Sequence, residues 1–203
     1  MKICKVIFVL GMIPAFFSCS EPKESSILVD GSEFPTLPAS AVKEPYVDQA
    51  DMVKITINNS QGNITGQGDY NMGFREGTWT EFHPNGFPQF ITSYVNGRKQ
   101  GLWMSLDNRG QLLERAYFHE DNLHGNYIKY NRTRIKEERY YVNGALEGPL
   151  KKYYDNGNLM EESIYSGGKL NGTAKWYDTE GNVTIEYEYV NGEWINPEGE
   201  ESE

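Results

Sequence analysis

Glycines recur with a period of about 24 residues over most of this 203-residue chain. Three independent series keep the same period, which is the signature of a repeat architecture. They consist of Gly77, Gly101, Gly125, Gly148 and Gly172; Gly62, Gly86, Gly110, Gly157 and Gly181; and Gly73, Gly97, Gly144, Gly168 and Gly192. Asp121 and Thr133 each stand where a series predicts glycine. All three series are one residue short at the same place, which indicates a single deletion in the turn around Asn131-Arg132-Thr133.

The segments between the glycines have the length of β-strands. One unit runs from Gly77 to Gly101 and contains Pro84-Asn85-Gly86 and Asn96-Gly97. Both are tight-turn signals, because Asn and Gly adopt positive φ at little cost. The pieces between the turns span about five and nine residues, and no apolar period of 3.6 survives this spacing of glycines. The sequence therefore predicts an all-β fold, an elongated single-layer antiparallel meander of stacked β-hairpins.

Aromatic residues follow the same period and are predicted to lie on both faces of the sheet. Side chains alternate along a strand, so Leu112 and Phe118 share a face, whereas Trp79 and Phe82 lie on opposite faces. A two-layer sandwich would need one clean apolar face, so this mixture favours a single sheet stabilised by cross-strand stacking. The most regular series contains Tyr70, Tyr94, Phe118, Tyr141, Tyr165 and Tyr189.

Composition agrees with a thin sheet and argues against nucleic-acid binding and against a cysteine-based metal site in the folded part. Hydrophobic residues make up only 38% of the chain, but aromatic residues reach 13%, which is too many for a disordered chain. The formal net charge of -10 argues against generic nucleic-acid binding, because phosphate backbones repel an acidic surface. Both cysteines lie in the first twenty residues, so the rest of the chain has no thiolate metal site or disulfide to offer.

The N-terminus has the pattern of a targeting segment. A short basic stretch precedes the apolar residues 6–17, which are too few to span a bilayer. The small residue before Cys19 resembles the lipobox of bacterial lipoproteins, and that resemblance implies lipidation of Cys19 and anchoring in the bacterial cell envelope, on the periplasmic or surface face of the outer membrane. An ordinary secretory signal with an incidental cysteine is the alternative. We therefore expect a signal peptide (1–18), a lipidated Cys and Pro-rich tether (19–50), a repeat domain (51–196) and an acidic tail (197–203).

The repeat motif resembles the MORN-repeat variant family. Gly77-Thr78-Trp79, Phe82, Asn85-Gly86, Tyr94, Asn96-Gly97 and Gly101 carry the match best, and Gly148, Tyr153, Asn156-Gly157, Tyr165, Gly168 and Gly172 repeat it. The resemblance covers about residues 53–196 and implies stacked β-hairpins with a role in protein or membrane association. Bacterial members are often described as antitoxin-like.

One candidate site follows from the repeat. Trp79 and Trp103 are equivalent residues one repeat apart, with Tyr127 in the next repeat. An exposed aromatic ladder of this kind binds peptides or sugar rings. The alternative is that the rings only stabilise the sheet.

The histidines predict no metal site. His119 and His124 are one residue too far apart for the His-Glu-x-x-His motif and fall in a turn rather than on a helix. The simplest interpretation is that both are polar turn residues, as is His83. We expect no catalytic constellation, metal or cofactor.

These features favour a non-enzymatic lipoprotein whose repeat sheet binds another protein in the cell envelope. Glycan or cell-wall binding through the aromatic ladder is one alternative, and neutralisation of a toxin is another. The sequence does not identify the partner.

Overall fold

The protein is described here by a computed structural model, in which residues 37–195 can be described. The predicted signal peptide, Cys19 and the predicted acidic tail lie outside these residues. The described part is all β. Its strands are β1 (Ala41–Tyr46), β2 (Gln49–Asn58), β3 (Ile64–Asn71), β4 (Phe74–Phe82), β5 (Pro88–Val95), β6 (Arg98–Leu106), β7 (Leu112–His119), β8 (Asn122–Leu123), β9 (Gly125–Asn131), β10 (Arg134–Val142), β11 (Ala145–Leu146), β12 (Gly148–Tyr153), β13 (Leu159–Ser166), β14 (Lys169–Tyr177), β15 (Val183–Val190) and β16 (Glu193–Ile195).

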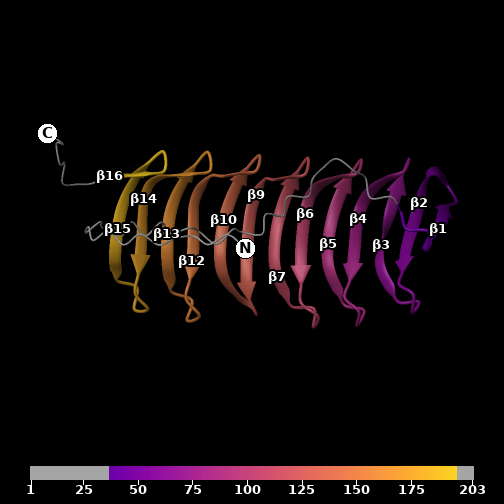
Figure 1. The fold of residues 1–203 in the computed structure, drawn as a ribbon, viewed down its shortest axis with the longest axis horizontal. Coiled ribbons are helices and arrows are strands. Elements are labelled where there is room, and N and C mark those ends of the chain that lie inside the picture. Colours follow the sequence, from indigo (N-terminus) through magenta and orange to yellow (C-terminus); the bar gives the residue numbers. More distant parts are fainter. Residues whose placement is uncertain (1–36, 196–203) are drawn as a thin grey trace, which may run out of the picture. The chain divides into compact units, whose positions relative to one another are not determined.

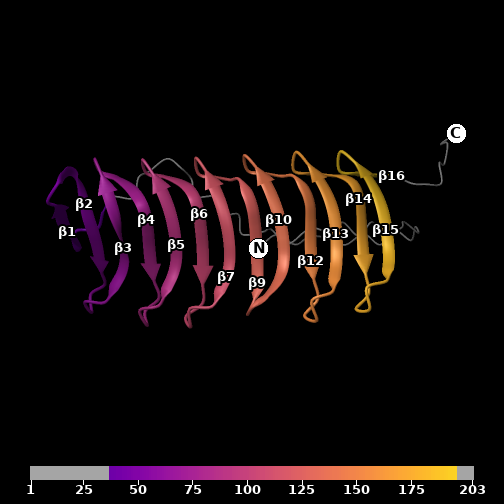
Figure 2. The same cartoon turned by 180° about the vertical axis from the view of Figure 1, so that it is seen from behind.

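The strands form one open antiparallel sheet that follows the order of the chain (Figures 1 and 2). Only β8 and β11 leave the main path, where they pair with β7 and β10. This confirms the predicted single-layer meander of hairpin repeats. In residues 37–195 there is no helix of the length and hydropathy that a membrane span requires.

The sheet begins earlier in the chain than the sequence indicates. Strand β1 and the start of β2 lie within residues 19–50, which the sequence analysis assigns to the tether. Ala41 pairs with Ile57 and Pro45 pairs with Val53, so this segment is the first strand of the sheet. Most of its side chains are exposed. It therefore lacks the apolar alternation by which a strand is recognised in a sequence.

One edge of the sheet consists of two-residue turns. At Asn96-Gly97 both residues have positive φ, 50° and 79°, which is the type I′ geometry that suits the twist of a hairpin. Asp121 occupies the glycine slot of its turn with φ 67°. The N–H of Gly97 donates to the carbonyl of Arg75 at 2.9 Å, and Asp121 makes the equivalent bond to Lys99 at 3.1 Å. Each of these turns is thereby joined to the preceding repeat.

The opposite edge has longer turns, of which residues 83–87 are typical. Between β9 and β10 only Arg132 and Thr133 remain, because Asn131 pairs directly with Arg134. The structure therefore places the deletion at the position that the glycine spacing predicts.

The glycine series that begins at Gly77 does not lie in turns. Between the pairs Thr92–Trp103 and Tyr94–Lys99, one residue of β5 faces three residues of β6, and Gly101 lies in that bulge with φ 90°. Gly77 in β4 and Gly172 in β14 lie in equivalent bulges. Bulges bend a strand and increase its twist, and glycine supplies the positive φ that this one requires.

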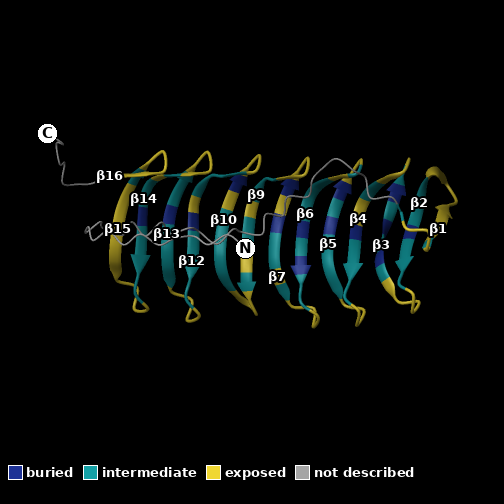
Figure 3. Cartoon of the chain, in the orientation of Figure 1, coloured by how far each residue is buried: buried dark blue, intermediate teal, exposed yellow. Residues whose placement is uncertain are grey.

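Burial is confined to one face of the sheet. Strand alternation places on it every residue that is buried among those described, and we call it the buried face. Its buried members are Ile55, Gly66, Gly68, Tyr70, Trp79, Thr92, Tyr94, Trp103, Ser105, Ala116, Phe118, Tyr141, Leu150, Ser163 and Ala174. Aromatic residues do occur on both faces, as the sequence predicts, but the other face, which we call the open face, buries none of its described residues (Figure 3).

Candidate binding face

The indole of Trp79 lies flat against the backbone of the preceding strand. The ring lies over Gly66 and Gly68 of β3: a Cβ atom on Gly68 would lie 2.3 Å from Trp79 Cε3. The Arg75 guanidinium stacks on the indole, 4.4 Å from its centroid, and donates a hydrogen bond of 3.0 Å to Tyr94 Oη. Tyr70 makes an edge contact at 5.6 Å. Trp79 is therefore enclosed by its neighbours, and only 1% of its surface is exposed.

Trp103 lies two strands away on the same face. Thr92 of β5 separates the two tryptophans, since it pairs with Trp79 on one side and Trp103 on the other. The Trp103 ring stacks on Phe90 at 6.0 Å and meets the edge of Phe118 at 6.5 Å. Large and small residues thus alternate from strand to strand, which lets the large rings interlock.

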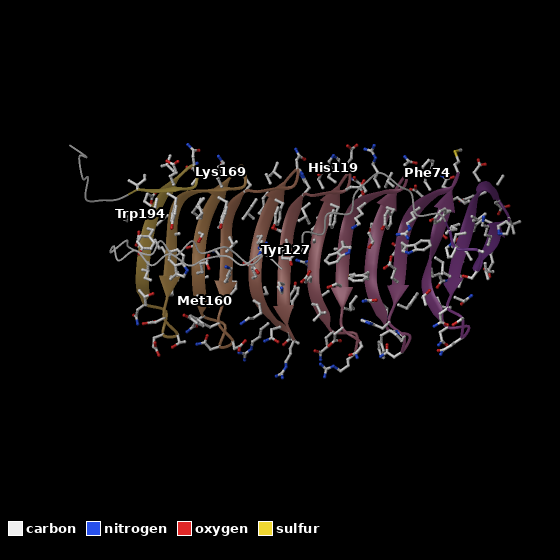
Figure 4. The ribbon with its side chains drawn as sticks, in the orientation of Figure 1. Phe74, His119, Tyr127, Met160, Lys169 and Trp194 are labelled. Carbon is white, nitrogen blue, oxygen red and sulfur yellow. The ribbon has the colours of Figure 1, made fainter. Side chains whose placement is uncertain are left out.

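Tyr127 continues this row in β9, near the middle of the sheet (Figure 4). It is half-buried, and its ring meets Tyr141 edge-on at 6.3 Å. The Arg139 guanidinium lies 5.5 Å from the ring centroid. Burial, followed by the negative charge of Glu114, raises the pKa of the Tyr127 phenol. The phenol is therefore held neutral and serves as a packed polar group.

The predicted aromatic ladder is thus correct in its geometry but not in its exposure. Trp79, Trp103 and Tyr127 share one face, yet the two tryptophans are buried by the rings, arginine and glycines around them. The error has a physical reason: side chains of neighbouring strands cover one another on the buried face, although the sheet has a single layer. The glycan alternative loses the exposed rings on which it depends.

The histidines have structural partners. His83 Nε2 lies 2.9 Å from the carbonyl oxygen of Leu106, one turn further along the sheet. His119 and His124 flank one turn, with ring centroids 5.6 Å apart. Within residues 37–195, no three His, Cys, Asp or Glu side chains are grouped as metal ligands would be.

His124 belongs to a series that the sequence analysis did not detect. The residue before each bulge glycine accepts a hydrogen bond from the first backbone N–H of the next two-residue turn. The acceptor–donor pairs are Glu76–Asn96 at 2.9 Å, Gln100–Glu120 at 3.1 Å, His124–Asn143 at 3.4 Å, Glu147–Gly167 at 2.8 Å and Asn171–Asn191 at 3.3 Å. All five positions carry an acceptor side chain, and this is the signal by which the series could have been found.

The open face carries two aromatic residues that solvent reaches, Tyr117 and Tyr140. Tyr117 and Tyr140 directly precede Phe118 and Tyr141, so strand alternation turns them to the other side of the sheet. They are 38% and 42% exposed. Strand β9 lies between β7 and β10, and its Asn126 pairs with Tyr140 on the open face. We call Tyr117, Asn126 and Tyr140 the tyrosine strip. Its sequence signal is weak, because the equivalent positions of neighbouring repeats are Ser93 and Ile164.

The fold and the turn pattern together define a repeat protein of stacked β-hairpins. Three of its segments, residues 75–96, 146–166 and 170–191, match the family model of the MORN repeat variant. The first match covers β4 and β5, and the other two cover the region from β11 to β15. The stretch between them contains both slots where Asp121 and Thr133 replace glycine. No curated protein matches the chain.

Proposed function

We propose that this chain is a non-enzymatic scaffold that is anchored to a membrane through Cys19 and binds another protein with its repeat sheet. The MORN-type repeats support a role in protein or membrane association. The fold supports it as well, because an open sheet of regular hairpins presents a long, ordered surface. Cys19 precedes the first strand by about twenty residues, which leaves a connecting segment between a lipid anchor and the sheet.

The observation that carries the proposal is the tyrosine strip on the open face. Tyrosine is enriched where proteins bind each other, since its ring offers a large contact at little entropic cost and its hydroxyl forms hydrogen bonds. Tyr117 and Tyr140 project from two strands held in register through β9, so their spacing is fixed before a partner arrives. Preorganisation of this kind lowers the entropic cost of binding.

A toxin-neutralising role differs from this proposal only in the identity of the partner. Both roles need a protein-binding surface, and both place it on the folded repeats. The burial of Trp79 and Trp103 gives no support to glycan binding through those rings.

Co-purification tests the proposal. The full-length chain is expressed in a bacterial host that has an outer membrane and is purified in detergent. The proteins that co-purify with it are compared with those that co-purify with the double variant Tyr117→Ser/Tyr140→Ser. We expect one partner to be depleted at least about tenfold in the variant, which corresponds to about 1.4 kcal/mol of binding. The matched control is Phe87→Ser, which removes an exposed ring in a turn. An unchanged set of partners in the double variant would contradict the proposal. The anchor is tested by intact mass, in which Cys19→Ser removes the acyl chains.

A further inference from the structure

The C-terminal end of the sheet has an edge that is only partly paired. Strand β15 pairs with β14 along its inner side, with a bulge at Thr184. On its outer side, β16 pairs only with Glu188, Tyr189 and Val190. Among the described residues, no strand pairs with the outer side of residues 183–187. The backbone groups along such an edge are a template for a further strand.

The side chains at this edge are exposed although their equivalents further inside are buried. Ile185 and Tyr187 lie on the buried face and are 45% and 42% exposed, and Val183, beyond the bulge of β15, is 50% exposed. Tyr187 pairs with Ala174, which is completely buried one strand further in. Trp194 of β16 meets the Tyr187 ring at 5.7 Å and is itself half exposed at this end of the sheet (Figures 3 and 4). The apolar row of the buried face therefore ends at this edge in side chains that remain nearly half exposed.

The open face ends at the same edge with an unbalanced charge. Glu138, Lys151, Glu162, Lys175 and Glu186 are successive cross-strand neighbours from β10 to β15, and they alternate in sign. Lys151 lies 3.2 Å from Glu162, and Lys175 lies 3.3 Å from Glu186. Opposite charges across a ladder stabilise strand pairing and like charges oppose it. A cation at the next position, beyond Glu186, would continue the alternation.

We infer that the outer edge of β15 accepts one further antiparallel strand from a partner polypeptide, with apolar side chains opposite Ile185 and Tyr187 and a Lys or Arg opposite Glu186. The inference deepens the proposed function and rests on it in one respect, namely that the partner is a protein. It uses a surface distinct from the tyrosine strip.

Three segments of this chain fit the edge poorly. In a second copy, the exposed edge strand β1 places Lys43 on the buried face, where it would meet Ile185, and Pro45 has no N–H to donate. Its Glu44 lies on the open face, the same side as Glu186. Two copies of β15 paired about Ile185 would place Thr184, not a cation, opposite Glu186. Residues 196–203 contain no Lys or Arg.

Synthetic peptides test this inference directly. The probe is Thr-Val-Lys-Val-Thr-Val-Ser, and its partner probe has Glu in place of Lys. Binding to the full-length chain in detergent is measured by fluorescence anisotropy at low salt, and the contact is located by hydrogen–deuterium exchange. We expect the Lys peptide to slow exchange in residues 183–187 and not in β1. We expect it to bind about fivefold more tightly than the Glu peptide, a modest ratio because Glu186 is exposed.

Charge-reversal variants test whether Glu186 sets the preference between the two peptides. Glu186→Lys should reverse the preference between the two peptides, and Ile185→Lys should weaken both. The matched control is Glu44→Lys, the same change at the other edge of the sheet, which should leave the preference unchanged. Equal affinities for the two peptides, protection at β1, or a preference unmoved by Glu186→Lys would overturn the inference. A dimer that forms without peptide and protects residues 183–187 would also overturn it, in favour of a second copy. None of these results bears on co-purification through the tyrosine strip, so the two proposals fail separately.

Discussion

The indole of Trp79 occupies the space that a side chain on Gly68 would need. A Cβ atom at Gly68 would lie 2.3 Å from Trp79 Cε3 and 3.1 Å from the carbonyl oxygen of Thr78. Neither neighbour yields easily, because the ring is enclosed and the carbonyl belongs to the sheet backbone. Glycine in the middle of a strand is ordinarily unfavourable, so its presence here is explained by the ring that lies on it.

Gly68→Ala should therefore destabilise the protein by about 1–3 kcal/mol, the usual range for an overpacked core. Gly66→Ala is the matched control in the same strand, because its Cβ would meet Trp79 at an ordinary 3.6 Å. Urea unfolding measures both free energies. Equal stability of the two variants would show that the ring does not depend on the glycine.

Truncation of Trp79 should cost far more than truncation of Trp194. Trp79 is almost completely buried, so Trp79→Ala should lower the free energy of unfolding by about 3–5 kcal/mol. Trp194 is half exposed, and Trp194→Ala should cost less than about 1 kcal/mol. Acrylamide quenching gives an independent check, since removal of Trp194 should delete the accessible fraction of the emission. A greater loss of stability in Trp194→Ala than in Trp79→Ala would contradict the assignment of Trp79 to the core.

The acceptor before each bulge glycine should stabilise the turn of the next repeat. Glu147 accepts hydrogen bonds from the Gly167 N–H at 2.8 Å and the Ser166 hydroxyl at 3.2 Å. Glu147→Ala should cost about 1 kcal/mol of stability, and Glu147→Gln, which keeps an acceptor oxygen, should cost less. Amide exchange at Gly167 should quicken in the alanine variant alone. If both variants quicken it equally, the charge rather than the hydrogen bond holds the turn.

Protonation of the aspartates in the long turns should lower the stability of the fold in acid. Asp178 accepts hydrogen bonds from the Asn182 side-chain amide at 2.9 Å and from the N–H groups of Asn182 and Glu180 at 2.8 and 3.0 Å. These bonds, led by that of the Asn182 side chain, lower the pKa of Asp178 below its usual 3.8. The carboxylate therefore stabilises the fold above its unfolded-state pKa, and this contribution disappears as pH falls through the lower folded-state pKa. Asp178→Asn should flatten the decline in melting temperature below about pH 4. Parallel melting profiles for the two proteins would exclude this role.

Local features of the fold were predictable, and the arrangement of the faces was not. Asn96-Gly97 predicts a type I′ turn, because few dipeptides adopt positive φ at both residues. The shortened turn at Thr133 follows from the spacing of the glycines. In contrast, Gly101 gives no sign that it lies in a bulge rather than a turn, because both conformations require positive φ. Side chains of neighbouring strands enclose the rings on one face of the sheet, and this burial does not follow from the residue spacing alone.

The candidate site shows the same limit. Trp79 and Trp103 were correctly placed on one face, but their burial depends on Arg75, Phe90 and Gly68, none of which the repeat period connects with them. Tyr117 and Tyr140 lie one residue from the regular aromatic series, and their neighbouring repeats carry other residue types. Exposure is a property of packing between strands, so a single sequence does not display it.

Residue-resolved crosslinking tests the central claim that the open face binds a protein. A photo-reactive phenylalanine analogue replaces Tyr117 or Tyr140 in the full-length chain, and Trp103 of the buried face in a control. Under illumination in cells, we predict one discrete protein adduct of the same mass from both tyrosine positions and none from the control. Folded protein that yields no adduct at Tyr117 or Tyr140 would contradict the account.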